Sequence, residues 1–354
     1  AYPAMLEAIA SAKQTICLET YILRDDELGV RFLDALEDRA RAGVEVLLMF
    51  DAFGSDVSEV NLARLRAAGV KLLMFRPWRY LGSLSRAWSK VKRRNHRKSL
   101  IVDGVIGFTG GLNISKNYAA VIDGGDGWRD THVRIWGPDA QALERLFLGT
   151  WLQNKGPRFD ERRFRRPVVA GCKQIKVVGN DFALDRKGIR RAYEEAFARA
   201  RDRVFVTNAY FLPPAKMVKA LVMAARRGVR VAVILAATTD VKIVLWAARG
   251  LYPRLLNNGI EVYEWANGRV LHAKTAVVDG TWATVGSSNL DPLSLRQNLE
   301  VNAIVTEPAF ASALERMFVE DLAQCQRITL ADVKQYGLVE RLVSWVAYRL
   351  RHWL

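Results

Sequence analysis

The stretch of sequence that decides the fold is HRKSLIVDG at residues 96–104, which returns as HAKTAVVDG at residues 272–280. Both copies begin with His, place Lys two residues later and reach Asp seven residues after the His. The likeness continues, because a Gly follows each His by fourteen residues and an Asn follows it by seventeen. The chain has four His residues, and two of them begin these copies. The repetition predicts one site that is built from two half-sites.

Each copy also predicts a buried strand that ends in a tight turn. Residues 98–102 and 274–278 are mostly apolar or β-branched after the Lys, and Asp-Gly follows each run, which is a hairpin signal. Side chains two residues apart in a strand point to the same face, so the His and Lys of each copy are expected about 6.5–7 Å apart on one face. Two copies that face each other across a pseudo-two-fold axis would supply two imidazoles and two ammonium groups.

This set of groups suits a displacement at the phosphorus of a phosphodiester. The reaction needs a nucleophile, an acid that protonates the departing alkoxide, and fixed cations that hold the non-bridging oxygens. Taken alone, each residue has a structural alternative. Asp103 and Asp279 stand where turn residues stand, and a purely structural role is as well supported for them as a catalytic one. Asn113 and Asn289 are of a type that caps helices and forms turns. The coincidence of all these positions in two copies favours the functional interpretation.

The repeat extends well beyond the motif, which is the stronger argument for two matching halves. The further matching segments are residues 8–21 with 196–210 (one residue inserted), 41–48 with 226–233, and 68–72 with 258–262. In the last two pairs a helix is predicted to stop at Gly, and an apolar or β-branched strand follows. Helix alternating with strand predicts an α/β layered fold. Each half has roughly 150–170 residues, a usual size for a domain.

With these residues in hand, the chain resembles the phospholipase D superfamily, in many of whose members the pattern H-x-K-x4-D occurs twice. The flanking text is similar to that of bacterial cardiolipin synthases, and it comprises LETYIL at 18–23, TGGLNI at 109–114, AYF at 209–211 and GSSNLD at 286–291. The resemblance implies two pseudo-symmetric α/β repeats, each a mostly β central sheet flanked by helices, with one shared active site. We expect the first repeat at residues 1–155, a basic linker at 156–170, the second repeat at 171–325 and an amphipathic helical tail at 326–354.

The resemblance also implies roles for the repeated residues. His96 would be the nucleophile that forms a phosphohistidine, and His272 would protonate the leaving group and then activate the acceptor hydroxyl. The near symmetry of the site makes this assignment depend on the family pattern. The other residues of the expected site are Lys98, Lys274, Asp103 and Asp279 of the motifs, and the phosphate-binding Asn113, Ser287 and Asn289. Gly111 stands where the second copy has Ser287, so the first half-site lacks that hydroxyl.

Two acidic residues are candidates for orienting the imidazoles. A carboxylate that accepts from one ring nitrogen fixes which nitrogen carries the proton. Glu300 follows His272 by twenty-eight residues, and the family pattern supports this role for it. Asp130 follows His96 by thirty-four residues, which agrees with a six-residue insertion around residues 124–127. The alternative for Asp130 is a surface charge at the start of a strand.

The sequence shows no pattern of a metal or nucleotide site. No His, Cys, Asp or Glu set has ligand spacing, and the phosphate-binding loop G-x-x-x-x-G-K-[ST] is absent. Cys17, Cys172 and Cys325 are scattered and odd in number, which favours a reduced compartment. The proposed chemistry requires neither a metal nor another cofactor.

The charge indicates an anionic partner. Fifty-three Lys and Arg against thirty-seven Asp and Glu give a net charge of +16, as in proteins that bind nucleic acid or an anionic membrane. Residues 76–98 hold nine Lys or Arg and no acid, interleaved with Trp78, Tyr80 and Trp88, and a second basic cluster covers 158–166. Such clusters are often solvated loops, but the aromatic residues favour a bilayer interface. In residues 337–354 one helical face is apolar, which fits either a membrane interface or packing on the protein.

These observations lead to one expected function and several alternatives. We expect a phosphatidyltransferase that makes cardiolipin and glycerol from two molecules of phosphatidylglycerol, on the cytoplasmic face of the bacterial inner membrane, with no nucleic acid partner. A hydrolase, a nuclease of the same superfamily and a non-catalytic membrane-binding protein are the alternatives. The sequence contains no run of eighteen apolar residues, the length that a membrane-spanning helix needs, and it shows no signal peptide. The second half opens with a strand at 174–178 that the first half lacks, so we expect further residues before Ala1, where an anchor could lie.

Overall fold

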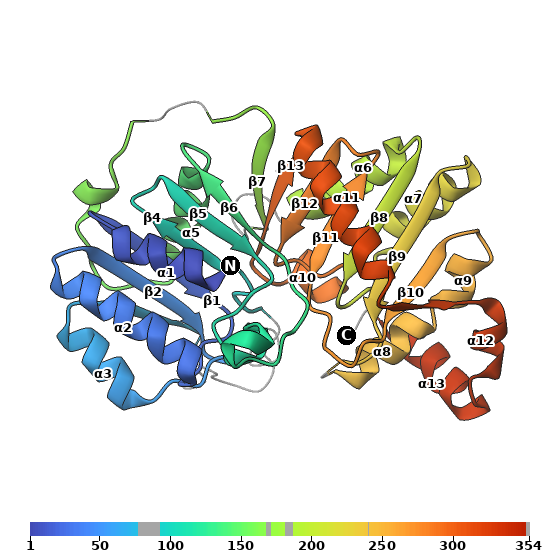
Figure 1. Cartoon of the computed structure of the whole chain (residues 1–354), viewed down its shortest axis with the longest axis horizontal. Coiled ribbons are helices and arrows are strands. Elements are labelled where there is room, and N and C mark those ends of the chain that lie inside the picture. Colours follow the sequence, from blue (N-terminus) through green and yellow to red (C-terminus); the bar gives the residue numbers. More distant parts are fainter. Residues whose placement is uncertain (77–92, 168–170, 181–186, 240, 352–354) are drawn as a thin grey trace.

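Two mixed β-sheets, each with helices on both faces, lie side by side in the computed structural model (Figure 1). The structure describes residues 1–76, 93–167, 171–180, 187–239 and 241–351. The first sheet has the order β3-β2-β1-β4-β5-β6, and the second has the order β14-β10-β9-β8-β11-β12-β13-β7. The expected fold of two α/β repeats with central sheets is confirmed.

The first sheet joins a parallel part to an antiparallel part. Its strands are β1 (Thr15–Thr20), β2 (Glu45–Asp51), β3 (Lys71–Phe75), β4 (Ser99–Val102), β5 (Ile106–Gly110) and β6 (His132–Trp136). The first three run parallel, whereas β4 pairs antiparallel with β1 and begins the meander that β5 and β6 complete. The helices of this half are α1 (Tyr2–Ser11), α2 (Glu27–Arg41), α3 (Glu59–Ala67) and α5 (Ala140–Gln153), with short 3-10 turns η2 (Lys116–Tyr118), η3 (Val121–Asp123) and η4 (Glu161–Phe164).

The second sheet repeats this plan and adds a strand at each edge. Its strands are β7 (Ile175–Asn180), β8 (Arg203–Asn208), β9 (Arg230–Ala236), β10 (Glu261–Trp265), β11 (Lys274–Val278), β12 (Trp282–Gly286), β13 (Glu300–Val305) and β14 (Cys325–Ile328). Its helices are α6 (Gly188–Arg199), α7 (Ala215–Arg226), α8 (Lys242–Arg249), α9 (Tyr252–Leu256), α10 (Pro292–Arg296), α11 (Pro308–Leu322), α12 (Leu330–Gln335) and α13 (Leu338–Arg349). β7 pairs with β13, and among the described residues of the first half no strand takes the matching place beside β6. The repeat boundaries and the residues expected before Ala1 stay predictions.

Apolar residues on both faces of each strand explain why every sheet lies between two helical layers. In β2, Val46 and Leu48 pack in the core beneath α1, α2 and α3, while Leu47 and Met49 pack in the core beneath α5. Strands that bury both faces carry nearly continuous apolar runs, as this one does. The core beneath α5 also takes in Val301 of β13, so apolar packing joins the two halves.

The strand pairing corrects the register expected for the repeat. Thr15 of β1 and Arg203 of β8 hold equivalent places, because each donates its backbone N–H to the Asp that ends the matching motif. At the other end, Leu23 bridges Ile114 as Phe211 bridges Leu290. The two intervals have equal length, so no residue is inserted between them. Tyr21 therefore corresponds to Ala209 and not to Tyr210, although matching the two tyrosines suggested otherwise.

The expected hairpins are present after both motifs. β4 pairs antiparallel with β5, and β11 with β12. Asp103 and Gly104 have φ of 52° and 63°, and Asp279 and Gly280 have φ of 52° and 64°. Two successive residues in the left-handed region form the turn whose twist matches a right-twisted hairpin, and Asp and Gly tolerate this conformation better than other residues. The Asp-Gly signal was therefore a correct guide to the local structure.

Candidate active site

The two His of the motifs lie just before their strands, where the two halves meet. β4 begins at Ser99 and β11 at Lys274, so each His precedes the regular strand that we expected to contain it. The opposite half holds each one in place. The backbone N–H of His96 donates to the carbonyl of Leu299 at 2.9 Å, and that of His272 donates to the carbonyl of Arg129 at 2.8 Å. The site is therefore built on bonds that cross between the repeats.

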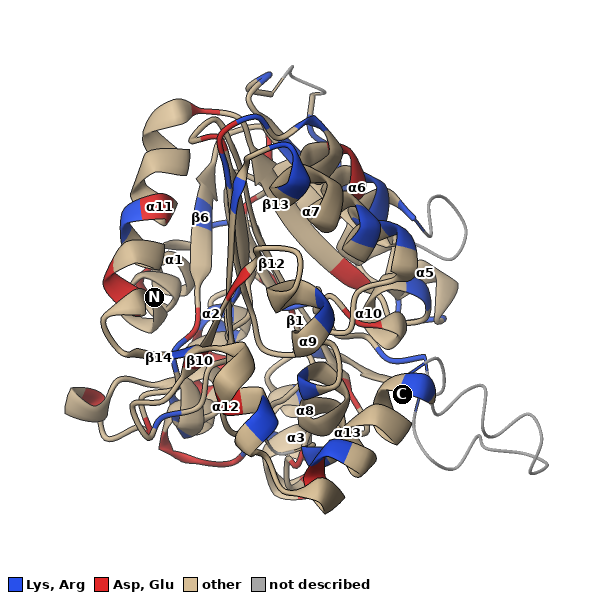
Figure 2. Ribbon diagram, turned by 90° about the vertical axis from the view of Figure 1, so that its right-hand side faces the viewer, with Lys and Arg blue, Asp and Glu red and all other residues tan. Residues whose placement is uncertain are grey.

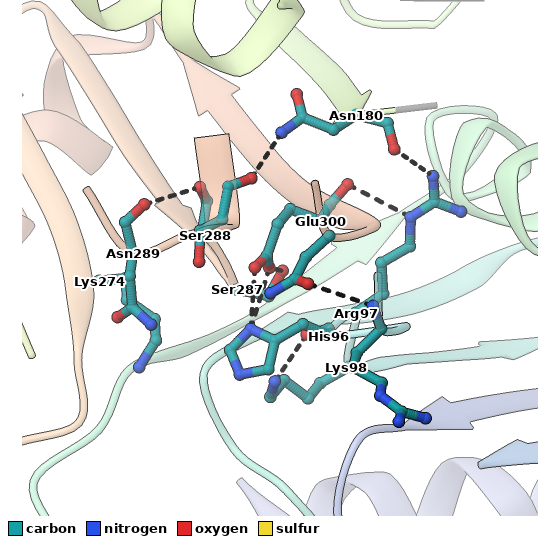
Figure 3. A network of polar contacts seen from close by, with 12 residues as sticks. His96, Arg97, Lys98, Asn180, Lys274, Ser287, Ser288, Asn289 and Glu300 are labelled. Atoms are coloured by element: carbon teal, nitrogen blue, oxygen red, sulfur yellow. Dashed lines mark hydrogen bonds and ion pairs between the residues drawn. The ribbon is translucent and has the colours of Figure 1, made fainter. Parts of the chain in front are cut away.

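The carboxylates that orient the imidazoles are exchanged between the halves. Nδ1 of His96 lies 2.9 and 3.1 Å from the two oxygens of Glu300, which belongs to the second half (Figure 3). Nδ1 of His272 lies 2.7 Å from Oδ2 of Asp130, which belongs to the first half. Both acids are fully buried, and both were expected as orienting residues. The sequence did not say which acid serves which His, and the structure shows that each half supplies the carboxylate for the other half's His.

The protonation of these pairs follows from the charges around them. Although burial opposes it, contact with His96, Lys98 and Ser287 holds the pKa of Glu300 below its usual value. Burial likewise opposes the low pKa of Asp130, which His272 and Lys274 bring about. Both acids are therefore ionised, and an ionised carboxylate can only accept a hydrogen bond. Each imidazole must then carry its proton on Nδ1, which leaves Nε2 available for chemistry.

Burial also keeps both imidazoles neutral near pH 7. It lowers the pKa of His96 even though Glu300 opposes the change. For His272, burial together with the Lys274 ammonium group lowers the pKa to about 4. Burial lowers the pKa of Lys98 to about 7, with Glu300 again acting in the opposite direction. A neutral imidazole with a free Nε2 lone pair is the form that can attack phosphorus.

The Lys of each motif lies beneath its His. Nζ of Lys98 donates to the carbonyl of His96 at 2.6 Å, and Nζ of Lys274 donates to the carbonyl of His272. Lys98 is 2% exposed and Lys274 is fully buried. Lys98 and Lys274 both lower the pKa of each imidazole, so the structure brings the two half-sites together as one cluster of charged groups.

Ser287 and Gly111 explain why the half-sites differ. The hydroxyl of Ser287 donates to Glu300 and accepts from the backbone N–H of Val301 at 3.1 Å. It therefore holds the carboxylate of Glu300 in place. In the first half, a Cβ on Gly111 would lie 2.0 Å from Oδ1 of Asp130. The carboxylate of Asp130 thus occupies the space that a Ser side chain at position 111 would need. Ser287 was expected to bind phosphate, and the structure places its hydroxyl on Glu300.

The two Asn residues have different environments. The side chain of Asn113 accepts from the backbone N–H of Ile22 at 3.0 Å and donates to the hydroxyl of Tyr118 at 2.7 Å. In the part of the chain that the structure describes, Oδ1 of Asn289 is buried without a hydrogen-bond partner. Phosphate binding by Asn113, Ser287 and Asn289 therefore stays a prediction, and Asn113 is already engaged in holding the backbone after β1.

The structure does not bring the Asp of either motif to the imidazoles. Asp103 accepts hydrogen bonds from the backbone N–H groups of Lys13, Gln14 and Thr15 at 2.8–2.9 Å. Asp279 does the same for Arg201, Asp202 and Arg203 at 2.8–2.9 Å. Both lie at the far end of their strands, about 15 Å along the chain direction from the Lys. Of the two roles considered for them, the structural one accounts for every contact that the structure shows, and they anchor the segments that lead into β1 and β8.

Sequence reasoning missed a buried Arg between His96 and Lys98 of the first motif. Arg97 is fully buried, and its guanidinium donates to the carbonyls of Glu300, Leu146 and Asn180 at 3.1–3.2 Å. It also donates to the hydroxyl of Thr150 at 2.9 Å. Arg97 therefore ties α5 to β7 and β13, and it holds the backbone of Glu300. The second copy has Ala273 at this position, so a search for repeated residues could not find it.

Aromatic rings around the imidazoles were also not assigned to the site. The ring of Tyr21 meets His96 edge-on, with centroids 4.9 Å apart. Tyr118 and Trp128 of the first half contact His272, with centroids 5.1 and 6.0 Å from it. The rings restrict the orientation of both imidazoles. Tyr118 and Trp128 lie in the sequence between Asn113 and Asp130, and aromatic residues in that interval are the signal that would have indicated them.

Of the two basic regions noted in the sequence, the structure describes the linker but little of the stretch before the first motif. Most of the basic stretch 76–98 lies outside the described residues, since these omit 77–92. In the linker, Arg166 donates to the carbonyl of Asp103 and the hydroxyl of Thr15, and Arg163 donates to the carbonyl of Gly43. These contacts tie that linker to the first half. Of the residues described, none form a group of three or more that could hold a metal ion, and no helix is long and apolar enough to cross a membrane.

Comparison with known proteins places this site in a family. A family model described as cardiolipin synthase, phospholipase D-like domain, matches residues 5–151 and 193–322. The cardiolipin synthase of Geobacillus kaustophilus is 34% identical over 350 residues, which cover 98% of this chain and 69% of that protein. The cardiolipin synthase of Clostridium perfringens (strain SM101) is 32% identical over 345 residues, covering 96% of this chain and 71% of that protein.

Solved structures give the same result for the fold. The phosphatidylserine synthase of Haemophilus influenzae covers 100% of this chain and 93% of its own, with a TM-score of 0.74 and 13% identity. The polyphosphate kinase of Porphyromonas gingivalis covers 91% of this chain and 48% of its own, with a TM-score of 0.59 and 15% identity. Likeness at such low identity concerns the fold alone. Taken with the sequence matches and the paired motifs, it shows that this chain belongs to the cardiolipin synthase family of phospholipase D-like phosphatidyltransferases.

Proposed function

We propose that this protein transfers a phosphatidyl group from one phosphatidylglycerol to a hydroxyl of another, giving cardiolipin and glycerol. The observation that carries the proposal is the pair of exchanged His–carboxylate contacts above two buried Lys. In the proposed reaction, Nε2 of one His attacks the phosphodiester and Nε2 of the other moves a proton. The identity of the lipid comes from the names of the relatives, which are cardiolipin synthases.

In the first step, Nε2 of His96 attacks phosphorus while the bond from phosphorus to the glycerol oxygen breaks. His272, protonated at Nε2, gives its proton to that oxygen, so glycerol leaves as a neutral alcohol. Lys98 and Lys274 stabilise the negative charge that gathers on the non-bridging oxygens. The family pattern assigns the nucleophile to His96, and its doubly contacted Glu300 supports a ring that is held firmly for attack.

In the second step, neutral His272 takes the proton of the acceptor hydroxyl, whose oxygen bonds to phosphorus as the bond to His96 breaks. The step regenerates both imidazoles in their starting forms and needs no other reactant. His272 must gain a proton before the first step, although burial and Lys274 lower its pKa to about 4. The negative charge of a bound phosphodiester opposes these effects, so substrate binding raises the pKa of His272.

The localisation belongs to the same proposal. Phosphatidylglycerol is a membrane lipid, and the net charge of +16 favours an anionic surface. We therefore place the protein on the cytoplasmic face of the bacterial inner membrane. No specific observation favours a nucleic acid substrate. A hydrolase remains the second candidate, because the same site would transfer the phosphatidyl group to water if water reached the intermediate.

The test is product analysis after incubation with phosphatidylglycerol vesicles, beside His96→Ala and His272→Ala variants. Cardiolipin and glycerol from the parent, with loss of at least about 10³-fold in either variant, would agree with the proposal. Phosphatidic acid as the main product would show a hydrolase with the same site. If the parent forms neither product but cleaves plasmid DNA, the lipid assignment is wrong.

A further inference from the structure

The C-terminal helix α13 packs with its small residues inward and its large apolar residues outward. Ser344 and Ala347 are the buried residues of this helix. They face α8, where Ala247 and Ala248 are buried and Gly250 lets the backbones approach, since a Cβ there would lie 2.4 Å from the carbonyl of Ser344. The helix is therefore held on the protein through its small face. Of the two explanations for its apolar pattern, packing on the body accounts for Ser344, Ala347 and the partly buried Tyr348, and not for the apolar residues that face outward.

The large side chains of α13 remain exposed. Leu338 is 82% exposed, Leu342 61% and Trp345 55%. Val339, Val346 and Leu350 are also exposed, and the set recurs at helical spacing. Isolated exposed apolar residues are normal, but a contiguous stripe marks a surface that contacts something apolar. Val241 and Ile243 at the start of the neighbouring α8 are exposed as well.

This stripe lies at the end of the second sheet where the carboxyl ends of β8 and β9 lie, which is also the end that holds the active site; we call this end the active-site edge. α8 follows the carboxyl end of β9, which runs parallel to β8, and β8 ends at Asn208 opposite Lys274. Figure 1 shows α8 and α13 together at that edge of the second half. The first half also has an exposed apolar tip near its half-site. Ile122 of η3 is 93% exposed, four residues after Tyr118, whose ring contacts His272.

Charge favours an anionic occupant for this edge. Lys242, Arg341 and Arg349 supply the positive charge of α8 and α13, while Arg249 pairs with both Glu264 and Glu340. Beside the end of α13, a pocket of about 160 Å³ is lined by Arg296, Arg351 and prolines such as Pro292. Figure 2 shows Lys and Arg on α8 and α13 on this side of the molecule. Apolar residues ringed by cations are the pattern of a helix that lies in the headgroup layer of an anionic bilayer.

We propose that the exposed faces of α13 and α8, with Ile122 on the other side of the active site, form the surface by which this enzyme docks on an anionic phospholipid bilayer. The inference rests on the proposed function and deepens it, because it says how the site reaches its lipid. Leu338, Leu342 and Trp345 enter the interfacial layer while Arg341 and Arg349 contact lipid phosphates.

The test measures binding and turnover separately. Sedimentation with vesicles of phosphatidylglycerol and phosphatidylcholine is compared for the parent, the double variant Leu342→Glu/Trp345→Glu and Ile243→Glu. Turnover is measured on the same vesicles and on monomeric dihexanoyl-phosphatidylglycerol. Trp136→Glu and Val319→Glu are the matched controls, because these residues are exposed but lie on β6 and α11 away from this surface. Arg341→Glu/Arg349→Glu serves as a charge-only variant if the double variant unfolds.

We expect the surface variants to bind vesicles at least about tenfold more weakly, which equals about 1.4 kcal/mol, while the controls bind like the parent. Turnover should fall on vesicles and persist on the monomeric lipid. Unchanged vesicle binding by the double variant and by the charge variant would overturn the docking surface. A parent that binds vesicles but makes no lipid product on either substrate would instead overturn the proposed function and leave the docking surface standing.

Discussion

The two half-sites use the same motif but support their imidazoles in different ways. His96 contacts both oxygens of Glu300, which is held by the Ser287 hydroxyl and, through its backbone, by Arg97. His272 contacts one oxygen of Asp130, which lies directly on the backbone of Gly111. A nucleophile must return to the same position at every turnover, whereas a proton donor only has to come within hydrogen-bond distance of the leaving oxygen. The firmer support around His96 therefore agrees with its proposed role, and the predictions below test this comparison.

The largest effects are expected when the orienting carboxylates become amides. Glu300→Gln and Asp130→Asn should each lower kcat by about 10³-fold or more, because an amide no longer selects the ring tautomer. The two differ when the leaving group is p-nitrophenol, which departs without a proton. On such a substrate, formation of the phosphohistidine should recover in Asp130→Asn but not in Glu300→Gln.

Rapid-quench trapping of the phosphorylated protein measures that step, with His272→Ala and His96→Ala as references for the two half-sites. Recovery in Glu300→Gln rather than in Asp130→Asn would exchange the roles of the two imidazoles. Equal loss in both variants would mean that the two halves do not divide the chemistry.

The next largest effect concerns the stability contributed by the buried Arg. Arg97→Ala gives the first motif the His-Ala-Lys of the second, but it removes the hydrogen bonds that Arg97 donates to three carbonyls and one hydroxyl. We expect the free energy of unfolding to fall by about 3–5 kcal/mol. Denaturant titration measures this change.

Arg129→Ala is the matched control, because Arg129 pairs with Asp321 across the same interface at 2.7 Å but is 19% exposed. Its removal should cost about 1–3 kcal/mol. A loss for Arg97→Ala no larger than that for Arg129→Ala would show that the first half does not depend on its Arg.

The two halves should also differ in their response to acid. His132 of β6 occupies the place that Asn302 takes in β13, and burial lowers its pKa to about 4. The unfolded chain takes up this proton near pH 6.5, whereas the folded chain does so near pH 4, so stability falls as the pH drops between these values. His132→Asn should remove about 2 kcal/mol of this loss at pH 5 and change little at pH 8.

Unfolding curves of the parent and His132→Asn at the two pH values provide the measurement. His272 has the same direction of shift and stays in both proteins, so part of the acid sensitivity should remain. An equal difference between the proteins at pH 5 and pH 8 would argue against titration of His132 as the cause.

The smallest effect is expected for the hydroxyl beneath Glu300. Ser287→Gly makes the second half resemble the first and removes one hydrogen bond to a charged group, so we expect kcat to fall about tenfold. The hydroxyl of neighbouring Ser288 donates to a backbone carbonyl at 3.1 Å, and Ser288→Ala is the control. Steady-state kinetics with KM determined separately would show whether the loss lies in kcat. Full activity in Ser287→Gly would show that Glu300 needs no such support.

The repeat explains which parts of this protein could be predicted from its sequence. Features present twice were found, among them the sheets, the two hairpins and the His, Lys and acid of each half-site. Features present once were missed, and Arg97 is the clearest example, because Ala273 stands in its place. Identical residue types also gave a wrong alignment of the repeats, since Tyr21 and Tyr210 seemed equivalent until strand pairing set them one residue apart. The exchange of carboxylates lay beyond the sequence, because either acid could have served either His.

The tail shows a different limit. Its apolar period was visible in the sequence, but the period could not say which face packs on the protein. Small residues decided the matter, because Ser344 and Ala347 allow the close approach that Gly250 also requires. Hydrophobic periodicity gives the direction of an apolar stripe, whereas packing depends on shape.

The exchange of carboxylates has a consequence for the newly made protein. While the ribosome has produced only the first half, His96 exists without Glu300, which follows some two hundred residues later. A polypeptide released early, or cut between the halves and separated, therefore carries His96 without the carboxylate that holds its ring. With His96 in its proposed role, reactivity toward phosphodiesters is expected only after the two halves have met.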